Sequence, residues 1–401
     1  MEEKIRLSNK IYPLFSGLSG DLLFWIAINT IFLTTVKGFN AAQISSFTTI
    51  GTLVSILLYS IIFKIIKKIG NIRSIKLGTI LLLCSAILLT FSNKYIFTLS
   101  GYILYDIAFF FKNMGNVVLR KNLKYEDREN EYIKIQNKSS FIYSFLTMVI
   151  AFSAGFLFNI NKYLPMILCI CCCILTVMLS NFLYEYKNTE DNMLKENGSK
   201  DRLHMTKIIF FILLLYASVY AIIDLGQANG KLFMQYKLSS FLEISKVSMF
   251  LSFIIAISRV VRVISNYCYT KYFNTRNKRI LYNIAYSLIF AYILIIFGSL
   301  LRFKVIGIIL MSIGFFIFLG SRDLFANYTK TLLLNNCNEE HHEQAITYLS
   351  LSRITGKFLI SGLITLLLLK IDIIYIMILL FIISILNILV IKEIYKLTER
   401  K

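Results

Sequence analysis

The stretch Lys187–Lys207, KNTEDNMLKENGSKDRLHMTK, decides how the rest of the chain is interpreted, because nowhere else does the sequence stay hydrophilic for so long. It contains a glycine and has no apolar periodicity, so it predicts an aqueous linker. Runs rich in Ile, Leu, Phe and Tyr occupy the chain on either side. The sequence therefore predicts two membrane-embedded halves, residues 1–186 and 207–401, joined by a cytoplasmic linker over residues 187–206.

The composition excludes a soluble domain of this size. Of 401 residues, 57% are hydrophobic and 16% charged, and the mean hydropathy is +0.68, which is typical of a polytopic membrane protein. The net charge of +21 would suggest nucleic acid in a soluble protein, but the basic residues fall mainly in short loops, as membrane topology requires. The expected surroundings are thus a lipid bilayer, and no nucleic-acid partner is expected.

The apolar runs predict helices that cross the membrane, since a span needs about 20 apolar residues. The first run has no small-residue cleavage site behind it and is expected to remain as a span. Twelve spans result, six on each side of the linker: 11–36, 42–63, 76–92, 95–118, 139–159, 164–186, 207–230, 244–269, 280–301, 305–330, 343–369 and 371–392.

Lysine and arginine are distributed unevenly between alternate loops. Those on the side of the N-terminus outnumber those on the other side by about three to one, which predicts that both termini and the linker are cytoplasmic. Richness in Ile, Lys, Asn and Tyr is typical of an AT-rich bacterial genome. The sequence thus predicts a multi-pass protein of a bacterial plasma membrane, and we expect it to be a monomer.

The two halves show signs of an internal repeat. Gln43-Ile44-Ser45 and Glu243-Ile244-Ser245 stand at the starts of the second and eighth spans, each followed by a basic turn, and repeated helical units are typical of transporters. The turn after the second span echoes a Gly-x-x-x-Asp-Arg-x-Gly-Arg-Lys loop through Phe63, Lys67, Lys68, Gly70, Asn71 and Ile72.

Together these features resemble the major facilitator superfamily over nearly the whole chain. The resemblance implies an all-α membrane protein with twelve transmembrane helices in two pseudo-symmetric six-helix bundles. It also implies transport of a small-molecule substrate by alternating access. The first glycine of the loop pattern is missing here, and a lysine replaces its acid.

Ionisable residues inside the spans are the candidates for function, because each costs about 2.5–3.5 kcal/mol at the bilayer centre. The acids lie on the first, fourth, seventh and tenth spans, which line the cavity in the family that this sequence resembles. Structural pairing between helices is the alternative. The acids are Asp21, Asp106, Asp224 and Asp323, and the bases are Lys112, Arg259, Arg262, Arg322, Arg353 and Lys357.

Helical spacing predicts polar faces on three spans. The eighth carries Ser245, Ser248, Ser252, Arg259, Arg262 and Asn266, and the seventh carries Tyr216, Tyr220, Asp224, Gln227 and Lys231. Both faces predict a hydrated pathway. The first span places Asp21, Trp25 and Asn29 at steps of four, and an aromatic ring beside a carboxylate suits an organic cation, although Trp is also an ordinary packing residue.

The depth of each ionisable residue along its helix indicates which of them could contact one another. Asp21 and Asp106 each lie roughly 15 Å inside their span, near mid-membrane, so either could carry a proton. We expect one or both of Lys112 and Arg322 to pair with an acid of a neighbouring helix, with Asp323 as the nearest candidate in depth for Lys112. The predicted end of the seventh span at residue 230 places Asp224 near the outer surface.

The sequence thus predicts a secondary active transporter of a small organic molecule that couples to protons and acts as an exporter. A lipid-linked oligosaccharide flippase and a non-transporting immunity or sensor protein are the alternatives. Nothing predicts an enzyme, a cofactor or a metal site, and we interpret the cysteines of ILCICCCIL as apolar filler. The expected substrate and proton pathway comprises Asp21, Trp25, Asn29, Asp106, Lys112, Tyr220, Asp224, Gln227, Arg259, Arg262, Arg322 and Asp323.

Overall fold

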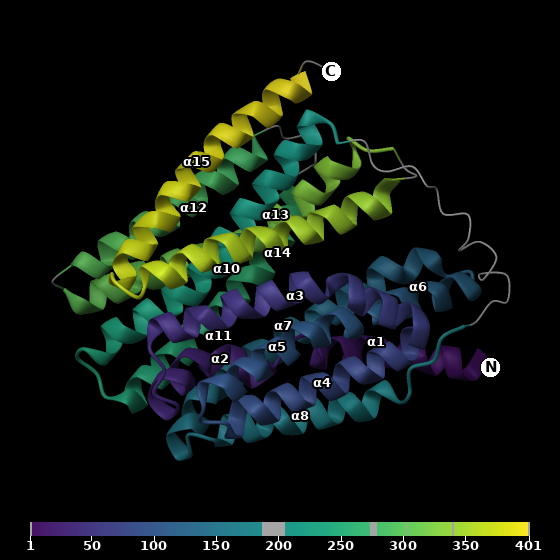
Figure 1. Cartoon of the computed structure of the whole chain (residues 1–401), viewed down its shortest axis with the longest axis horizontal. Helices are drawn as coiled ribbons and strands as arrows, with labels where there is room; N and C mark the ends of the chain where they lie inside the picture. Colours follow the sequence, from purple (N-terminus) through teal and green to yellow (C-terminus); the bar gives the residue numbers. More distant parts are fainter. Residues whose placement is uncertain (1, 187–204, 273–278, 302, 339–340, 400–401) are drawn as a thin grey trace. The chain divides into compact units, whose positions relative to one another are not determined.

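A computed structural model describes residues 2–186, 205–272, 279–301, 303–338 and 341–399. The described residues are helical, with no strand among them, and form two compact units (Figure 1). The first unit falls within Met1–Phe32, Ile50–Gly198 and Ser248–Ala256, and the second within Leu33–Thr49, Ser199–Val247 and Ile257–Lys401. Most of the predicted linker, residues 187–204, lies outside the described residues.

Most of the chain before the linker belongs to the first unit. Its helices are α1 (Glu2–Leu18), α2 (Leu23–Ile31), α3 (Ala41–Ile69), α4 (Asn71–Phe91), α5 (Tyr95–Lys112), α6 (Met114–Tyr125), α7 (Tyr132–Ile160) and α8 (Leu164–Ser180). A π-helical turn over Phe32–Val36 extends α2. The start of α3 packs in the second unit.

The rest of the second unit contains α10 (Lys207–Ser239), α11 (Ile244–Tyr272), α12 (Ile280–Leu300), α13 (Lys304–Leu334), α14 (His342–Leu367) and α15 (Ile373–Glu399). Among the described residues, 10 helical segments are long and apolar enough to cross a membrane. Helices α5, with 18 residues, and α8, with 17, occupy the two remaining predicted positions. The twelve-helix architecture is thus confirmed.

The same helix pairs pack in both units. In the first unit α4 packs against α5 and α8, and in the second α12 packs against α13 and α15 (Figure 1). The first span of each unit likewise packs against the fifth and sixth, as α1 and α2 do with α7 and α8, and α10 does with α14 and α15. The two units therefore repeat the same pattern of helix packing, as expected for a six-helix repeat.

Several helices run further than hydropathy predicts. Helix α3 continues through its lysines to Ile69, and Gly70 alone turns the chain into α4, with φ +84° and ψ 166°. Only glycine adopts that conformation readily. Both helices therefore extend beyond the predicted span bounds at residues 63 and 76, because lysine is a good helix former and its charge does not end a helix.

The seventh span was also predicted too short, because the polar run Gln227–Lys231 does not interrupt α10, which ends at Ser239. Asp224 therefore lies near the middle of its helix and not near the outer surface. The opposite error occurs in the first span, where an interruption was missed. Residues 19–22 are non-helical between α1 and α2, so Asp21 stands in a helix break.

Two short segments pack away from the half of the sequence to which they belong. At the start of α3, Ser45 and Thr49 each hydrogen-bond the Thr365 hydroxyl of α14 at 2.9 Å. On α11, Ser248 donates to Asn159 of α7 at 2.9 Å, and a Cβ on Gly155 would lie 2.8 Å from the Ser248 carbonyl oxygen. Small residues allow this close approach, as in other membrane helices.

Gly356→Ala is expected to lower the free energy of unfolding by about 1–3 kcal/mol, the usual cost of overpacking. A Cβ there would lie 2.7 Å from the carbonyl carbon of Ala217 and 2.9 Å from its Cα, and this backbone cannot give way as a side chain could. Denaturant unfolding in detergent measures the effect. Gly230→Ala is the matched control, because its nearest neighbour would be 3.9 Å away, and equal effects of the two variants would contradict the prediction.

Candidate transport sites in the two units

Asp224 is the centre of a charge cluster in the second unit. Its Oδ1 lies 3.3 Å from Nη2 of Arg322 on α13, and its Oδ2 accepts a 2.9 Å hydrogen bond from Nη2 of Arg353 on α14. Lys357, one helical turn beyond Arg353, also interacts electrostatically with this carboxylate. The side chains of Asp224, Arg322 and Arg353 are 12%, 25% and 35% exposed. One acid thus stands among three bases, and part of the cluster is open.

Aromatic rings form one side of this cluster. The guanidinium of Arg353 lies over the Tyr220 ring, 4.2 Å from its centroid, a cation–π contact that orients the arginine. Tyr220 also packs against Tyr216 and Phe325, at centroid distances of 4.7 and 6.1 Å. Gln227 follows Asp224 on the same face of α10, and its buried Nε2 has no hydrogen-bond partner among the described residues.

Asp323 forms a second and simpler arrangement. It accepts hydrogen bonds from Nε and Nη2 of Arg262 at 2.7 and 2.8 Å, and from Asn266 at 2.8 Å. The predicted pair of Asp323 with Lys112 is wrong, because Arg262 and Asn266 of α11 occupy both carboxylate oxygens. Arg322 does pair with an acid of a neighbouring helix, as expected, and that acid is Asp224.

In the first unit, Asp21 occupies the break between α1 and α2. Its Oδ1 accepts from the backbone N–H of Leu22 at 2.8 Å and from the hydroxyl of Tyr105 on α5. Lys112, 8% exposed, donates to the carbonyl of Ser19 and interacts electrostatically with Asp21. Lys112 thus stabilises the Ser19 carbonyl, which lies at the helix break and outside the regular helical hydrogen bonds.

Asp106 lies on the same helix as Tyr105, in a setting rich in tyrosine. Tyr102 and Tyr105 both interact electrostatically with its carboxylate, and a Cβ on Gly51 of α3 would lie 2.8 Å from its Oδ2. Tyr102 in turn packs edge-on against Trp25 at 5.8 Å. Tyr105 therefore interacts with both carboxylates, Asp21 and Asp106.

Two other predicted residues of the first span serve local structure. Trp25 is 4% exposed and also packs edge-on against Phe32, at 6.3 Å. The Asn29 side-chain oxygen accepts from the backbone N–H of Thr30 at 2.8 Å. These contacts favour the packing interpretation of Trp25 over an organic-cation site.

The polar face predicted on the eighth span divides into two parts. Near its start, Ser248 and Ser252 are buried where α11 approaches α7. Further along, Arg259 is 8% exposed and interacts with Lys231 of α10, which is 5% exposed. This face is therefore largely packed against protein and does not form the continuous water-lined stripe that the periodicity suggested.

Sequence reasoning missed part of both sites. Arg353 and Lys357 were recognised as intramembrane bases but had no periodic pattern to select them, and Tyr102 and Tyr105 resembled ordinary aromatic residues. The position of Arg353, four residues before Lys357 and therefore on the same face, was the available signal.

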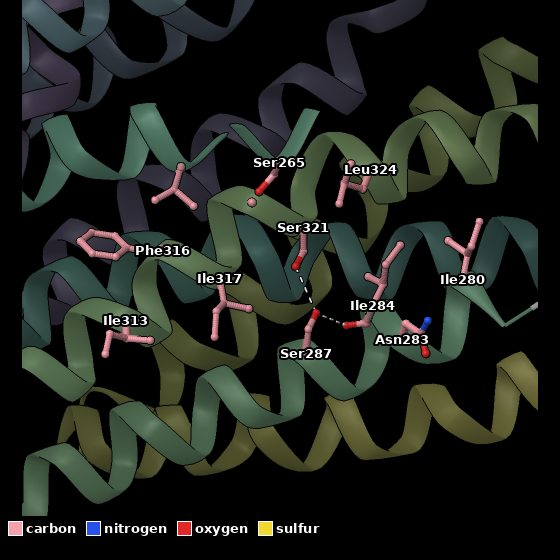
Figure 2. Close-up of a pocket in the computed structure, with 12 residues that line it drawn as sticks. Ser265, Ile280, Asn283, Ile284, Ser287, Ile313, Phe316, Ile317, Ser321 and Leu324 are labelled. Carbon is pink, nitrogen blue, oxygen red and sulfur yellow. Dashed lines mark hydrogen bonds between the residues drawn. The ribbon is translucent and has the colours of Figure 1, made fainter. Parts of the chain in front are cut away.

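A separate pocket of about 350 Å³ lies between α11, α12 and α13 in the second unit (Figure 2). Its wall is mainly Ile, Phe and Leu, and Figure 2 shows Ser287 hydrogen-bonded to Ser321, at 3.2 Å, between them. Among the described residues, no ionisable side chain lines this pocket. It is distinct from the Asp224 cluster and suits a hydrocarbon group.

Solved structures share this fold. No protein-family model matches the sequence, and a search of curated proteins finds no match. A mutant of the nucleoside transporter NupG aligns with TM-score 0.72 and 9% identity, over 98% of this chain and 100% of that chain. A bacterial homologue of the iron transporter ferroportin, in an inward-facing state, aligns with TM-score 0.66 and 14% identity, over 97% of this chain and 98% of that chain.

A D-xylose-proton symporter aligns with TM-score 0.65 and 12% identity, over 98% of this chain and 97% of that chain. Identities this low establish the fold alone. They agree with the twelve helices and with the packing pattern repeated in the two units. Over nearly its whole length, the chain therefore has the fold of major facilitator superfamily transporters.

Proposed function

We propose that the protein is a secondary active transporter of a small organic molecule that works by alternating access. The observation that supports this most directly is the fold likeness over nearly the whole chain to proteins described as transporters. Ionisable side chains in the middle of spans support it further, because such residues are costly in a membrane and mark substrate or ion pathways. The Asp224 cluster and the Asp21–Asp106 region are the two sites proposed for this pathway.

Protons are the coupling ion in this proposal, and Asp21 or Asp106 carries them. A carboxylate in a helix break, hydrogen-bonded to Tyr105 and close to Lys112, has polar neighbours that could exchange a proton with it. Both acids interact with Tyr105, so protonation of one would alter the surroundings of the other. Such coupled carboxylates are suited to linking a proton to a conformational change.

Asp21→Asn and Asp106→Asn are expected to reduce proton-driven flux in proteoliposomes at least tenfold for one variant or both, because an amide cannot carry the proton. The transported compound is the one that most raises the melting temperature of the purified protein in a screen of metabolites and drugs. Exposed Lys396→Gln is the control and should retain flux. Undiminished proton-linked flux in both aspartate variants would exclude these two carriers.

The proposal also states the direction of transport and the location of the protein. We propose export across a bacterial plasma membrane by a monomer whose termini are cytoplasmic. Greater cellular accumulation of the compound in cells that lack the protein would support export, and lower accumulation would contradict it. The flippase alternative required a helix arrangement without the six-plus-six repeat and is therefore not favoured. A compound that binds but is never transported would favour the sensor alternative.

A further inference from the structure

The membrane-embedded part of the second unit carries more positive than negative charge. Its carboxylates away from the helix ends are Asp224 and Asp323, whereas its bases are Lys231, Arg259, Arg262, Arg322, Arg353 and Lys357. Intramembrane bases normally pair with acids, because an uncompensated charge is costly there. The excess is concentrated around Asp224, where three of these bases surround one carboxylate.

The two aspartates of this unit, Asp323 and Asp224, are paired in different ways. Asp323 is matched by one arginine in a two-bond fork, Nε and Nη2 of Arg262 at 2.7 and 2.8 Å. Asp224 is instead shared between Arg322 and Arg353, each of which approaches through a single Nη2. With Lys357 nearby, the Asp224 cluster has a net charge of +2.

Donor capacity remains at this cluster. A guanidinium has five N–H donors in a planar fork that suits carboxylate and phosphate oxygens. Arg353 uses one of its donors on Asp224 within the described structure, and its contact with Tyr220 holds the fork in place. The buried Nε2 of Gln227, one turn from Asp224, is a further donor with no partner among the described residues.

Aromatic side chains surround these donors. Tyr216, Tyr220 and Phe325 form a contiguous aromatic cluster, with centroids 4.7 to 6.1 Å apart. These rings are buried, with Tyr216, Tyr220 and Phe325 8%, 6% and 1% exposed, so they support the position of Arg353 from the protein side. The Arg353 side chain is 35% exposed, so protein does not enclose it completely.

We propose that the Asp224 cluster binds an organic anion through its carboxylate or phosphate group. The anionic group bonds Arg353 and Arg322 in place of the Asp224 carboxylate. Asp224 then acts as an internal competitor that occupies the arginines when no substrate is bound. The biological meaning of this site rests on the proposed transport function, but its chemistry can be tested by binding alone.

The test is a thermal-shift titration of the purified full-length protein with four probes of similar size: benzoate, phenyl phosphate, benzamide and benzylamine. We expect benzoate or phenyl phosphate to raise the melting temperature, and neutral benzamide and cationic benzylamine to leave it unchanged. Arg353→Gln should weaken anion binding at least tenfold, and Arg353→Lys should weaken it less. Exposed Lys396→Gln removes one positive charge elsewhere and should bind like the parent protein.

Asp224→Asn provides the decisive measurement, because a misfolded variant could not produce the expected result. Removal of the competing carboxylate should strengthen anion binding at least threefold. Preference for benzylamine, weaker anion binding in Asp224→Asn, or equal anion binding in Arg353→Gln would each overturn the inference. If the protein binds anions but transports nothing in proteoliposomes, the proposed transport function is contradicted and the anion-site inference stands.

If it transports only neutral compounds, and Arg353→Gln does not change that transport, the anion-site inference is overturned and the transport function stands.

Discussion

Asp323→Leu is expected to lower the free energy of unfolding by about 3 kcal/mol, the lower end of the cost of breaking a buried ion pair, because this pair is only partly buried. The Arg262 guanidinium would lose both bonds of its fork, at 2.7 and 2.8 Å, while its side chain is 19% exposed and cannot be fully rehydrated. Arg262→Met should cost a similar amount, because it leaves the Asp323 carboxylate with Asn266 alone. Denaturant unfolding in detergent micelles measures both variants.

The double variant Arg262→Met/Asp323→Leu tests whether the pair is structural. We expect it to recover most of the lost stability, since apolar side chains of similar volume often replace a buried pair at little cost. Retained transport in the double variant would remove these two residues from the predicted pathway. If the single variants each cost less than about 1 kcal/mol and their effects add, the pair behaves like an exposed one and the prediction fails.

Lys112→Met should be comparably harmful, at about 3–5 kcal/mol, because it removes the cation from a buried charge interaction. The Ser19 carbonyl would lose its donor, which by itself costs about 1–3 kcal/mol. The Asp21 carboxylate would lose the nearby positive charge. Since α1 and α2 depend on these contacts at their break, transport should also fall more than tenfold. Unfolding in detergent and flux in proteoliposomes measure the two effects.

Two further variants separate the contributions of Lys112. Lys124→Met on α6 is the matched control, because its side chain is exposed, and it should change stability by less than about 0.5 kcal/mol. Lys112→Met/Asp21→Asn should be more stable than Lys112→Met alone, because the remaining carboxylate no longer needs a cation. Strictly additive effects of the two substitutions would show that Lys112 and Asp21 are not coupled.

The interruptions of the helices show where sequence patterns mislead. Hydropathy ends a span at the polar run Gln227–Lys231, but α10 continues because backbone hydrogen bonds do not depend on side-chain polarity. Hydropathy also continues a span through residues 19–22, where the helix breaks. That break is stabilised by Lys112, which lies 90 or more positions away in the sequence. A local pattern cannot contain such a partner.

The sequence by itself determined that the chain is a twelve-helix membrane protein with a six-helix repeat, because a lipid environment requires apolar runs of a set length and leaves the helix as the way to satisfy their backbone. It also indicated most of the ionisable residues inside the spans, but not Lys231, because the seventh span was predicted to end at residue 230. Only the tertiary structure decided how they combine, with Asp224 shared between Arg322 and Arg353 and Asp323 held by Arg262. Each partner is supplied by another helix, and the rotation of one helix against another depends on packing of the whole unit, which no single span encodes.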